Sequence, residues 1–377
     1  MKKDKLAILI GFMPNPRIFK RVALESELYE VHLICWDRGS NMIPHKDSGN
    51  CVIHTIRIEA SNHPLKRLLP YAKFKREALK LLNELQPAVV HAQMIDILKI
   101  AVTYADSSRK KVRMIYEIAD LHRLIVDKQT NPVKRAVQLY LRHEDKRCSE
   151  KIDLLIVTSD RYYKMYFCDF VPRDKVLYFP NVPDLSAFRD YKRHNGEGDS
   201  FTVGYIGGVR YKEQCGLMID AAKSLDMPLL FAGYENDEPE IETLCRAYDK
   251  GTWIGGFDFK TQIADLYGRC DVIYSVYDAD MANVRVALPN KLYEAVYCGL
   301  PIIAAKNTHL AETIDEWGVG GAVDHKNVDD LVDLLKKMRD DREWYLSLVR
   351  NCEAHADEID LNKFNEELKK ILIGWEA

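Results

Sequence analysis

The fold is decided by the stretch Val203-Gly204-Tyr205-Ile206-Gly207-Gly208-Val209-Arg210-Tyr211-Lys212, an apolar strand that ends in two glycines just before a helical segment. Strand, glycine turn and helix in this order are typical of a parallel sheet covered by helices. Glycines let a backbone approach phosphate closely, and Arg210 adds a bidentate phosphate donor. An ordinary turn remains the alternative, and the spacing is not the Gly-x-Gly-x-x-Gly of a dinucleotide site.

The same alternation extends in both directions. Before this stretch we expect strands near Lys5–Gly11, Glu30–Trp36, Val52–Ile58, Ala88–Ala92, Arg113–Glu117, Asp153–Val157 and Val176–Phe179, with helices over Pro16–Leu28, Lys66–Leu85 and Val133–Ser149. From it onward we expect strands over Phe201–Ile206, Pro228–Ala232, Val272–Tyr277 and Pro301–Ala305, and helices over Gln214–Leu225, Glu238–Tyr248 and Asn290–Cys298. The predicted fold class is α/β, with two doubly wound Rossmann-like domains and ligands bound in a cleft between them.

Composition limits the class of protein. The chain has 377 residues, 47% of them hydrophobic and 29% charged, which fits two globular cores. No apolar run approaches the ~20 residues of a membrane span, and the apolar start fits a first strand better than a signal peptide. The nine cysteines show neither Cys-x-x-Cys nor zinc spacing. This pattern predicts a reduced, cytoplasmic environment without a disulfide or metal framework.

Charge is distributed unevenly. Residues 1–190 carry 33 Lys and Arg against 23 Asp and Glu, a net +10, whereas the remainder carries 21 against 34, a net −13. The basic half suits an anionic membrane surface or a phosphate-bearing acceptor, unless the spread is chance. Ser61–Leu82 is basic, amphipathic and interrupted by Pro70. It fits either contact with anionic lipid or an ordinary helix with its apolar face in the core. Nucleic acid is not an expected partner, because no stacking aromatics interleave this stretch.

A second motif follows at Leu288-Pro289-Asn290-Lys291-Leu292-Tyr293-Glu294 and continues into Cys298-Gly299-Leu300-Pro301-Ile302-Ile303. Lys291 and Glu294 are three residues apart and share one face at the start of the predicted helix. That end of a helix is electropositive, so a lysine there suits a bound anion, and the glutamate suits ribose hydroxyls. A surface ion pair is the alternative.

Together these segments resemble GT4-type retaining glycosyltransferases of the group 1 family, as found in bacterial polysaccharide biosynthesis. The motif around Lys291 resembles their donor-site helix, and Gly207–Lys212 resembles their glycine-rich loop. Further resemblances are Asn15-Pro16-Arg17-Ile18 at the opening, Val89-Val90-His91-Ala92 and Val157-Thr158-Ser159 at strand ends, and Tyr178-Phe179-Pro180-Asn181 before the second domain. The resemblance spans nearly the whole chain in the expected order and implies the GT-B fold.

The resemblance and the polar stretch at residues 183–200, which lacks an apolar period, together give the domain assignment. We assign 1–185 to an acceptor-binding domain and 198–358 to a nucleotide-sugar-binding domain. The resemblance further implies that 359–377 forms a helix that crosses back to the first domain.

The resemblance also implies functional residues. Catalysis is assigned to Arg210, Lys291 and Asp120, the first two as pyrophosphate ligands. Donor binding is assigned to Gly207, Gly208, Asn290, Leu292, Glu294, Gly233 and Phe257, with Glu294 on the ribose. Contacts with the donor sugar or acceptor are assigned to Gly11, Phe12, Arg17, His91 and His122. No metal ligand and no cofactor are expected.

Two positions depart from the family pattern. Many members carry a second glutamate eight residues before the position of Glu294, but Val286 stands here. Asp278, Asp280 and Asn283 are nearby replacements. A family histidine is replaced by Ala119, which leaves Asp120 as the favoured acid/base or orienting group ahead of His122. A helix N-cap is the alternative for Asp120.

The predicted activity is transfer of a sugar from a nucleotide-diphosphate donor, UDP-linked among others, to a saccharide or polyprenyl-linked acceptor. The setting would be assembly of capsule or exopolysaccharide, in the cytoplasm or at the inner face of the plasma membrane. Two alternatives stay open. One is a nucleotide-sugar 2-epimerase of the same fold, and the other is a non-catalytic subunit that binds sugar nucleotides.

Overall fold

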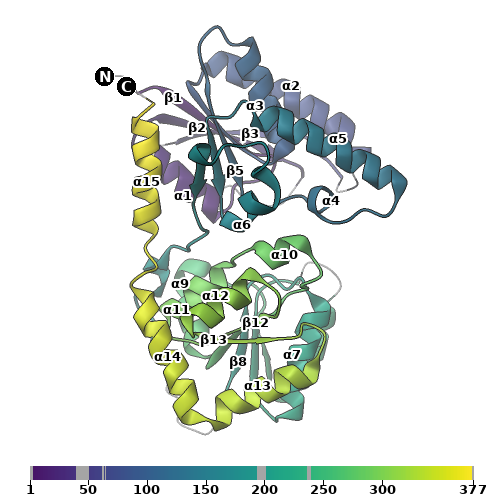
Figure 1. The fold of residues 1–377 in the computed structure, drawn as a ribbon, viewed down its shortest axis with the longest axis vertical. Helices are drawn as coiled ribbons and strands as arrows, with labels where there is room; N and C mark the ends of the chain where they lie inside the picture. Colours follow the sequence, from purple (N-terminus) through teal and green to yellow (C-terminus); the bar gives the residue numbers. More distant parts are fainter. Residues whose placement is uncertain are drawn as a thin grey trace. The chain divides into compact units, whose positions relative to one another are not determined.

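Two compact units make up the chain. The computed structural model describes residues 3–39, 51–61, 63, 65–192, 201–235 and 239–375. The first unit comprises Met1–Pro180 with Asn362–Ala377, and the second comprises Asn181–Leu361. Each unit is built on one sheet whose paired strands all run parallel, with helices as the connections (Figure 1). The predicted fold class, α/β with two Rossmann-like domains, is confirmed.

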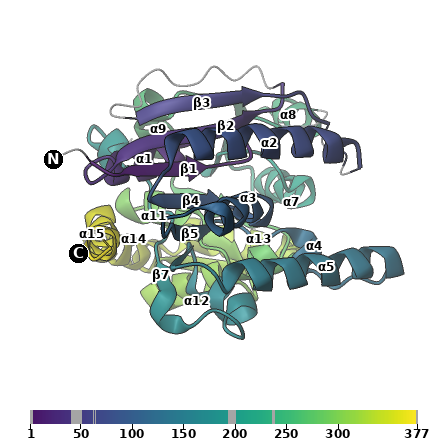
Figure 2. The same cartoon turned by 90° about the horizontal axis from the view of Figure 1, so that it is seen from above.

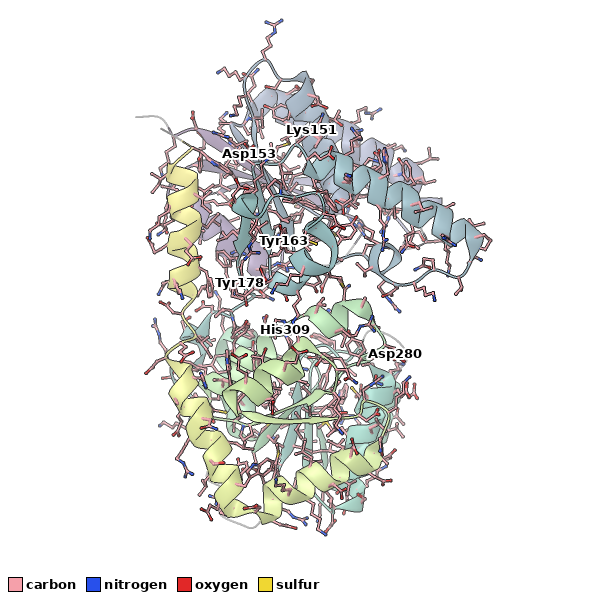
Figure 3. All side chains as sticks on the ribbon, viewed as in Figure 1. Lys151, Asp153, Tyr163, Tyr178, Asp280 and His309 are labelled. Carbon is pink, nitrogen blue, oxygen red and sulfur yellow. The ribbon has the colours of Figure 1, made fainter. Side chains whose placement is uncertain are left out.

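The sheet of the first unit has seven strands in the order β3-β2-β1-β4-β5-β6-β7, of which all but β6 are labelled in Figure 2. The strands are β1 (Lys5–Leu9), β2 (Glu30–Asp37), β3 (Cys51–Arg57), β4 (Val89–Gln93), β5 (Arg113–Ile118), β6 (Leu154–Val157) and β7 (Val176–Tyr178). Asp153, labelled in Figure 3, lies just before β6, where it accepts from Arg113 at 2.7 Å and from the Met114 N–H at 2.9 Å. This carboxylate therefore fixes the register of β5 and β6 at their first residues.

Helices connect these strands. They are α1 (Pro16–Glu25), α2 (Leu68–Leu85), α3 (Ile95–Ser107), α4 (Arg123–Val126), α5 (Pro132–Ser149) and α6 (Asp160–Tyr162), with shorter turns at η1 (Leu65–Arg67), η2 (Tyr163–Phe167) and η3 (Arg173–Lys175). Helix α1 begins where the sequence favours it, because the Asn15 side chain accepts from the Ile18 N–H and Pro16 occupies the first turn.

The second unit repeats the plan with six strands in the order β10-β9-β8-β11-β12-β13. Its strands are β8 (Val203–Ile206), β9 (Leu229–Ala232), β10 (Gly251–Trp253), β11 (Val272–Ser275), β12 (Ile302–Ala305) and β13 (Gly320–Val323). Its helical elements are η4 (Leu185–Phe188), α7 (Lys212–Ser224), α8 (Glu240–Arg246), α9 (Phe259–Gly268), α10 (Ala282–Val286), α11 (Asn290–Tyr297), α12 (His309–Trp317), α13 (Val328–Asp340) and α14 (Arg342–Ala356). The strand order reverses between β8 and β11, which is where such sheets bind ligands.

The last helix, α15 (Leu361–Ile373), packs against the first unit. The Phe364 ring lies 6.0 Å from that of Tyr178 and 5.8 Å from that of Phe179. Tyr29 donates a hydrogen bond to the Leu372 carbonyl at 3.3 Å, and Lys369 pairs with Glu27 at 2.7 Å. The chain thus ends on the same sheet on which it begins.

The predicted elements agree with the observed ones to within a few residues, but several elements escaped prediction. The missed helices and strands are α3, α4, α6, β10, α9, α10, α12 and β13. In the expected linker, Leu185–Phe188 forms a 3₁₀ turn that buries Phe188. The rest of that linker, from residue 193 to 200, and with it the expected domain start at 198, lies outside the described residues. No helix in the described ranges is long and apolar enough to cross a bilayer.

A buried network of charges ties α1 to the centre of the first sheet. His91 on β4 is fully buried, with Nδ1 2.6 Å from Glu25 of α1 and Nε2 3.0 Å from Glu117 of β5. Arg21 of α1 donates to both oxygens of Glu117 at 3.2 Å and stacks on the Phe179 ring at 3.6 Å. Two cations and two carboxylates therefore compensate one another inside the core, which buried charges require.

The imidazole of His91 titrates far from its ordinary range. Burial lowers its pKa, but the two adjacent carboxylates outweigh burial and raise it to about 9. Glu117 shifts in the other direction: burial raises its pKa, but Arg21 and His91 outweigh that and hold it well below its usual range. Near neutral pH His91 is therefore protonated and Glu117 is ionised.

We expect stability to fall on the alkaline side because of His91. The folded protein keeps the proton up to about pH 9, whereas the unfolded chain releases it near 6.5. The contribution is therefore complete below pH 6.5 and is lost as pH rises through 9, at up to about 1.4 kcal/mol per pH unit. His91→Gln should flatten this decline, as measured by urea unfolding between pH 6.5 and 9.5. The exposed-site control His143→Gln should decline like the wild type, and parallel curves for wild type and His91→Gln would contradict the assignment.

Candidate functional site

Three glycines lie at the carboxyl edge of the second sheet, one after each of β8, β9 and β10. Gly207, Gly233 and Gly255 all have positive φ, at 127°, 143° and 73°. Gly207 donates its N–H to the Ala232 carbonyl at 2.7 Å, and Gly233 donates to the Gly255 carbonyl at 2.6 Å. The backbones at this edge are thus packed directly on one another without side chains between them.

Gly233 cannot be another residue without rearrangement. A Cβ at this position would lie 1.9 Å from the carbonyl oxygen of Gly207, well inside contact distance. Gly207 in turn faces Lys291, whose Cε would lie 3.4 Å from a Cβ built on that glycine. The glycine turn after β8 therefore brings a bare backbone close to the lysine at the start of α11.

Lys291 is buried, with 7% of its surface exposed. Its Nζ lies 3.4 Å from the centre of the Tyr205 ring and 5.3 Å from that of Tyr277. Within the described part of the chain this ammonium forms no ion pair. Burial is the main cause that lowers its pKa to about 7, while Cys215 and Glu294 raise it and Arg210 lowers it. An anionic partner would restore its full charge.

The start of α11 lacks a cap. Pro289 precedes the helix and supplies no side-chain acceptor, so an anion can take that place. Asn290, the first helical residue, has a buried side-chain oxygen without a hydrogen-bond partner among the described residues. Arg210 is exposed on the loop after β8, with Nε folded over Gly208, and it is near enough to contribute to the lowered pKa of Lys291. The structure thus groups Gly207, Gly208, Arg210, Asn290 and Lys291.

Glu294 and Leu292 face the interior from the same helix. Glu294 is 5% exposed and accepts a hydrogen bond from Tyr267 of α9 at 2.5 Å, so part of its acceptor capacity is already used. Leu292 is fully buried, and its N–H donates to the Pro289 carbonyl at 3.1 Å. The expected donor contact of Leu292 is therefore corrected to a role in the core. Phe257 lies on the loop after β10, partly exposed.

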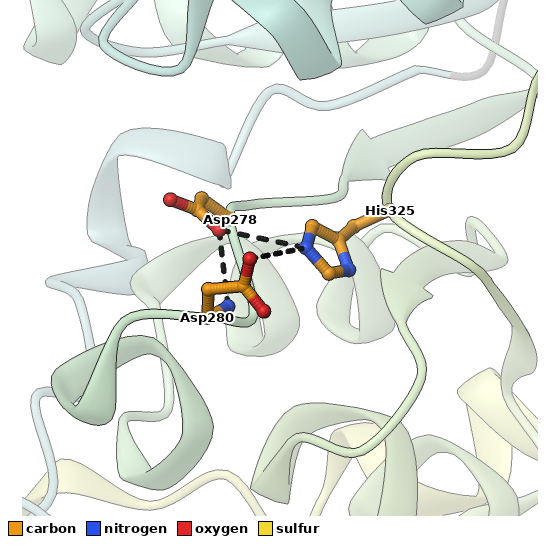
Figure 4. Close-up of side chains that lie close together, drawn as sticks. All are labelled: Asp278, Asp280 and His325. Atoms are coloured by element: carbon orange, nitrogen blue, oxygen red, sulfur yellow. Dashed lines mark hydrogen bonds and ion pairs between the residues drawn. The ribbon is translucent and has the colours of Figure 1, made fainter.

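The loop after β11 carries the acids expected to replace the missing glutamate at Val286. His325, which follows β13, lies with Nε2 3.5 Å from Asp278 and 3.9 Å from Asp280 (Figure 4). Lys326 also pairs with Asp280, and Arg285 of α10 donates to the carbonyls of Ala279 and Asp280. The side chains of Asp278, Asp280 and His325 are close enough to one another to hold a metal ion, although Asp280 already has a cationic partner in Lys326.

In the first unit, the residues expected to meet the acceptor or donor sugar lie in different environments. Gly11 is buried after β1, with its carbonyl accepting from Arg38, and Phe12 next to it is partly exposed. Arg17 donates to Gln93 at 3.4 Å and lies beside the charge network described above. His91 belongs to that network with no exposed surface, so its expected contact with a sugar is corrected to a structural role.

Asp120 and His122 follow β5. Asp120 is exposed and accepts a hydrogen bond from Tyr162 at 3.1 Å. His122 is the N-cap of α4, since its Nδ1 accepts from the Leu124 N–H at 3.2 Å, so the alternative of an N-cap at Asp120 is wrong. Burial and the neighbouring Arg67 lower the pKa of His122. A neutral His122 therefore carries its proton on Nε2 and can donate from there.

Residues 188–355, nearly all of the second unit, match the family model described as Glycosyl transferases group 1. The second unit is a group 1 glycosyltransferase domain. The match covers the glycine turn, Arg210 and the whole of α11, so the group 1 family predicted from these segments is confirmed.

Known proteins resemble the chain beyond this group 1 domain. The succinoglycan biosynthesis protein ExoL of Rhizobium meliloti (strain 1021) is 21% identical over 286 residues, which cover 72% of this chain and 67% of that protein. Sucrose-phosphate synthase (tll1590) from Thermosynechococcus elongatus superposes with a TM-score of 0.76 at 16% identity and 100% coverage of both chains. Anabaena Alr3699/HepE in complex with UDP gives a TM-score of 0.73 at 14% identity, covering 99% and 100%. The structural matches establish the fold.

Two residues of the site in the group 1 domain were not anticipated from sequence. Tyr205 and Tyr277 flank Lys291, yet Tyr205 lies within the apolar strand β8 and Tyr277 two residues after the apolar strand β11, where an aromatic residue ordinarily indicates core packing. The available clue was their place near the carboxyl ends of β8 and β11, the two strands between which the strand order reverses.

We expect Gly233→Ala to destabilise the group 1 domain by at least about 2 kcal/mol, because its Cβ would collide with the Gly207 carbonyl. The matched control is Gly216→Ala in α7, where a Cβ would meet nothing within 4 Å. That change should stabilise by about 0.5–1 kcal/mol through better helix propensity. Urea unfolding measures both, and equal effects of the two substitutions would contradict the backbone contact.

Proposed function

We propose that this protein transfers a sugar from a nucleoside-diphosphate donor to a saccharide or lipid-linked saccharide during assembly of a cell-surface polysaccharide. The observation that carries the proposal is the Lys291 ammonium, which is buried at an uncapped helix start beside bare glycine backbone, near Arg210. Two cations and free backbone donors in one place fit a diphosphate. The group 1 family match and the likeness to ExoL of succinoglycan biosynthesis support the polysaccharide setting.

In this proposal the chain stabilises the leaving group. As the bond to the sugar breaks, negative charge grows on the diphosphate, and Arg210 and Lys291 are already in place to compensate it. Asn290 and the first N–H groups of α11 supply further donors, and Glu294, on the same helix, is assigned to the ribose. Because HepE was solved in complex with UDP, UDP is the first nucleotide to test.

The donor-sugar and acceptor roles are proposed for other residues. We assign the sugar hydroxyls to Asp278, which directly follows the Tyr277 ring beside Lys291. Gly11, Phe12 and Arg17 are assigned to the acceptor or donor sugar. Asp120 is proposed as the acid/base or orienting group, because it is exposed and held by Tyr162. Transfer should retain the anomeric configuration, as in the GT4-type enzymes that the chain resembles, and proton NMR of the product reads this directly.

The products distinguish a sugar transferase from the two alternatives, an epimerase and a binding subunit. An epimerase would convert a UDP-sugar in the absence of any acceptor, whereas a binding subunit would hold UDP and yield neither transfer nor donor hydrolysis. Incubating the protein with radiolabelled UDP-sugars, with and without acceptor, distinguishes the three.

We expect Lys291→Ala and Arg210→Ala each to lower kcat/KM by about 10²–10³, since each removes one preorganised charge from the leaving group. The control Lys306→Ala removes an exposed lysine that pairs with Asp330 in the same unit and should change the rate by less than threefold. We propose that no metal is required, so the wild-type rate should persist in EDTA. Near-normal turnover of either site variant would contradict the site, and loss of activity in EDTA would contradict the metal-free mechanism.

We further propose that the first unit docks on an anionic membrane through the start of α2. The two faces of this helix differ: Phe74, Ala78 and Leu82 are buried in the core, whereas Leu68 and Leu69 are 62% and 78% exposed. Lys66 and Arg67 immediately precede these leucines. Exposed leucines flanked by cations suit an interface with anionic lipid, where a polyprenyl-linked acceptor would be found.

Flotation with vesicles that contain anionic phosphatidylglycerol tests this docking. Wild-type protein should float at low salt, and the double substitution Leu68→Ser with Leu69→Ser should reduce the bound fraction several-fold, because the apolar contact is lost. Leu244→Ser, at a site 39% exposed in the second unit, is the control and should float like the wild type. Absence of wild-type binding at low salt would contradict docking.

A further inference from the structure

The partners of Lys291 are aromatic rings. Its Nζ lies 3.4 Å from the centre of Tyr205 and 5.3 Å from that of Tyr277, and a third tyrosine, Tyr211, stacks on Tyr277 at 4.9 Å. The face of an aromatic ring attracts a cation, most strongly where water is excluded. Unlike a carboxylate, however, it leaves the positive charge uncompensated. The ammonium is thus held in position and remains available to an anion.

Tyr205 is itself held rigidly. It is 1% exposed on β8, its ring lies 5.5 Å from that of Phe231 on β9, and its hydroxyl donates to the Gly208 carbonyl at 2.8 Å. One side chain therefore contacts the lysine through its ring and the glycine turn through its hydroxyl. The position of Nζ relative to the bare backbone of Gly207 and Gly208 depends on this residue.

Other charged and titratable groups around Lys291 do not fix its protonation at neutral pH. Arg210 on the loop after β8 disfavours the ammonium, whereas Glu294 of α11 and the Cys215 thiol of α7 favour it. Burial is the largest effect, and the resulting pKa is about 7. Above neutral pH the free site therefore holds an uncharged amine much of the time, and a diphosphate would draw a proton from solvent onto it.

We propose that Tyr205 is a positioning residue whose ring holds the Lys291 amine beneath the glycine turn without a counter-ion, so that binding of a nucleoside diphosphate is coupled to uptake of one proton by Lys291. This rests on the proposed function, since it takes the diphosphate as the anion of the site. The proton comes from solvent and no covalent bond to the ligand forms or breaks. The hydroxyl of Tyr205 serves the turn, and its ring serves the lysine.

Calorimetry with UDP tests the coupling. Titrations at pH 8 in two buffers that differ in ionisation heat give the number of protons taken up, and the terminal phosphate is already ionised there. Wild-type protein should take up close to one proton, and its Kd should rise about tenfold per pH unit between pH 7 and 9. Lys291→Arg, which stays charged, should take up none and show a nearly flat profile.

Two substitutions at Tyr205 separate ring from hydroxyl. Tyr205→Phe keeps the ring, so the midpoint of the pH dependence of Kd should stay near pH 7, as in the wild type. Tyr205→Leu removes the ring attraction while keeping the site apolar, and should move the midpoint down by about one pH unit, equal to a tenfold weaker protonation. If Tyr205→Leu fails to fold, Tyr277→Leu should shift the midpoint in the same direction by less.

The outcomes are distinct. UDP binding by the wild type without proton uptake would overturn the coupling while leaving the proposed function intact. Equal profiles for the Phe and Leu variants would overturn the role of the Tyr205 ring. Failure of the wild type to bind UDP or another nucleoside diphosphate at any pH would overturn the proposed function itself.

Discussion

The contact between the Lys291 ammonium and the Tyr205 ring is the interaction on which the site of the second unit depends. It places a cation in a buried position without a carboxylate, at the start of a helix that has no cap. Beside it, Gly207 and Gly233 bring bare backbone together where the strand order reverses. Each feature alone would destabilise the folded protein, because a buried charge and unpaired N–H groups both lose their hydration. A bound diphosphate would satisfy them together.

The first unit buries charge in the opposite way. Arg21, Glu25, His91 and Glu117 lie in its core, and every charge there faces an opposite one. Such a network connects α1 to β4 and β5 and leaves nothing for a ligand to complete. The contrast is between this network and Lys291: each charge of the network faces an opposite charge, whereas Lys291 forms no ion pair within the described residues.

Much of this arrangement follows from sequence, because it rests on local patterns. Apolar runs gave the main strands, and three-residue spacing placed Lys291 and Glu294 on one face of a helix that begins after Pro289. Elements without such patterns escaped prediction. Strand β13 begins with two glycines, and α10 has only five residues, too few to show a helical period.

Roles set by distant partners could not be predicted. His91 is the polar residue in the middle of the apolar strand β4, but its partner Glu25 is 66 residues away and Glu117 lies on another strand. Tyr205 resembles a core residue until α11 brings Lys291 onto its ring. His122, rather than Asp120, caps α4, because the cap depends on where a four-residue helix starts. For His91 and Tyr205, tertiary contacts decide what the residue does, and a single sequence does not contain them.

A crystal structure of the protein with UDP bound tests the central claim most directly. The account predicts the diphosphate at the start of α11, with oxygens within hydrogen-bond distance of Lys291 Nζ, the Arg210 guanidinium and the backbone N–H of Gly208. A diphosphate seated elsewhere, with Lys291 still covered by Tyr205 and touching no phosphate oxygen, would contradict it.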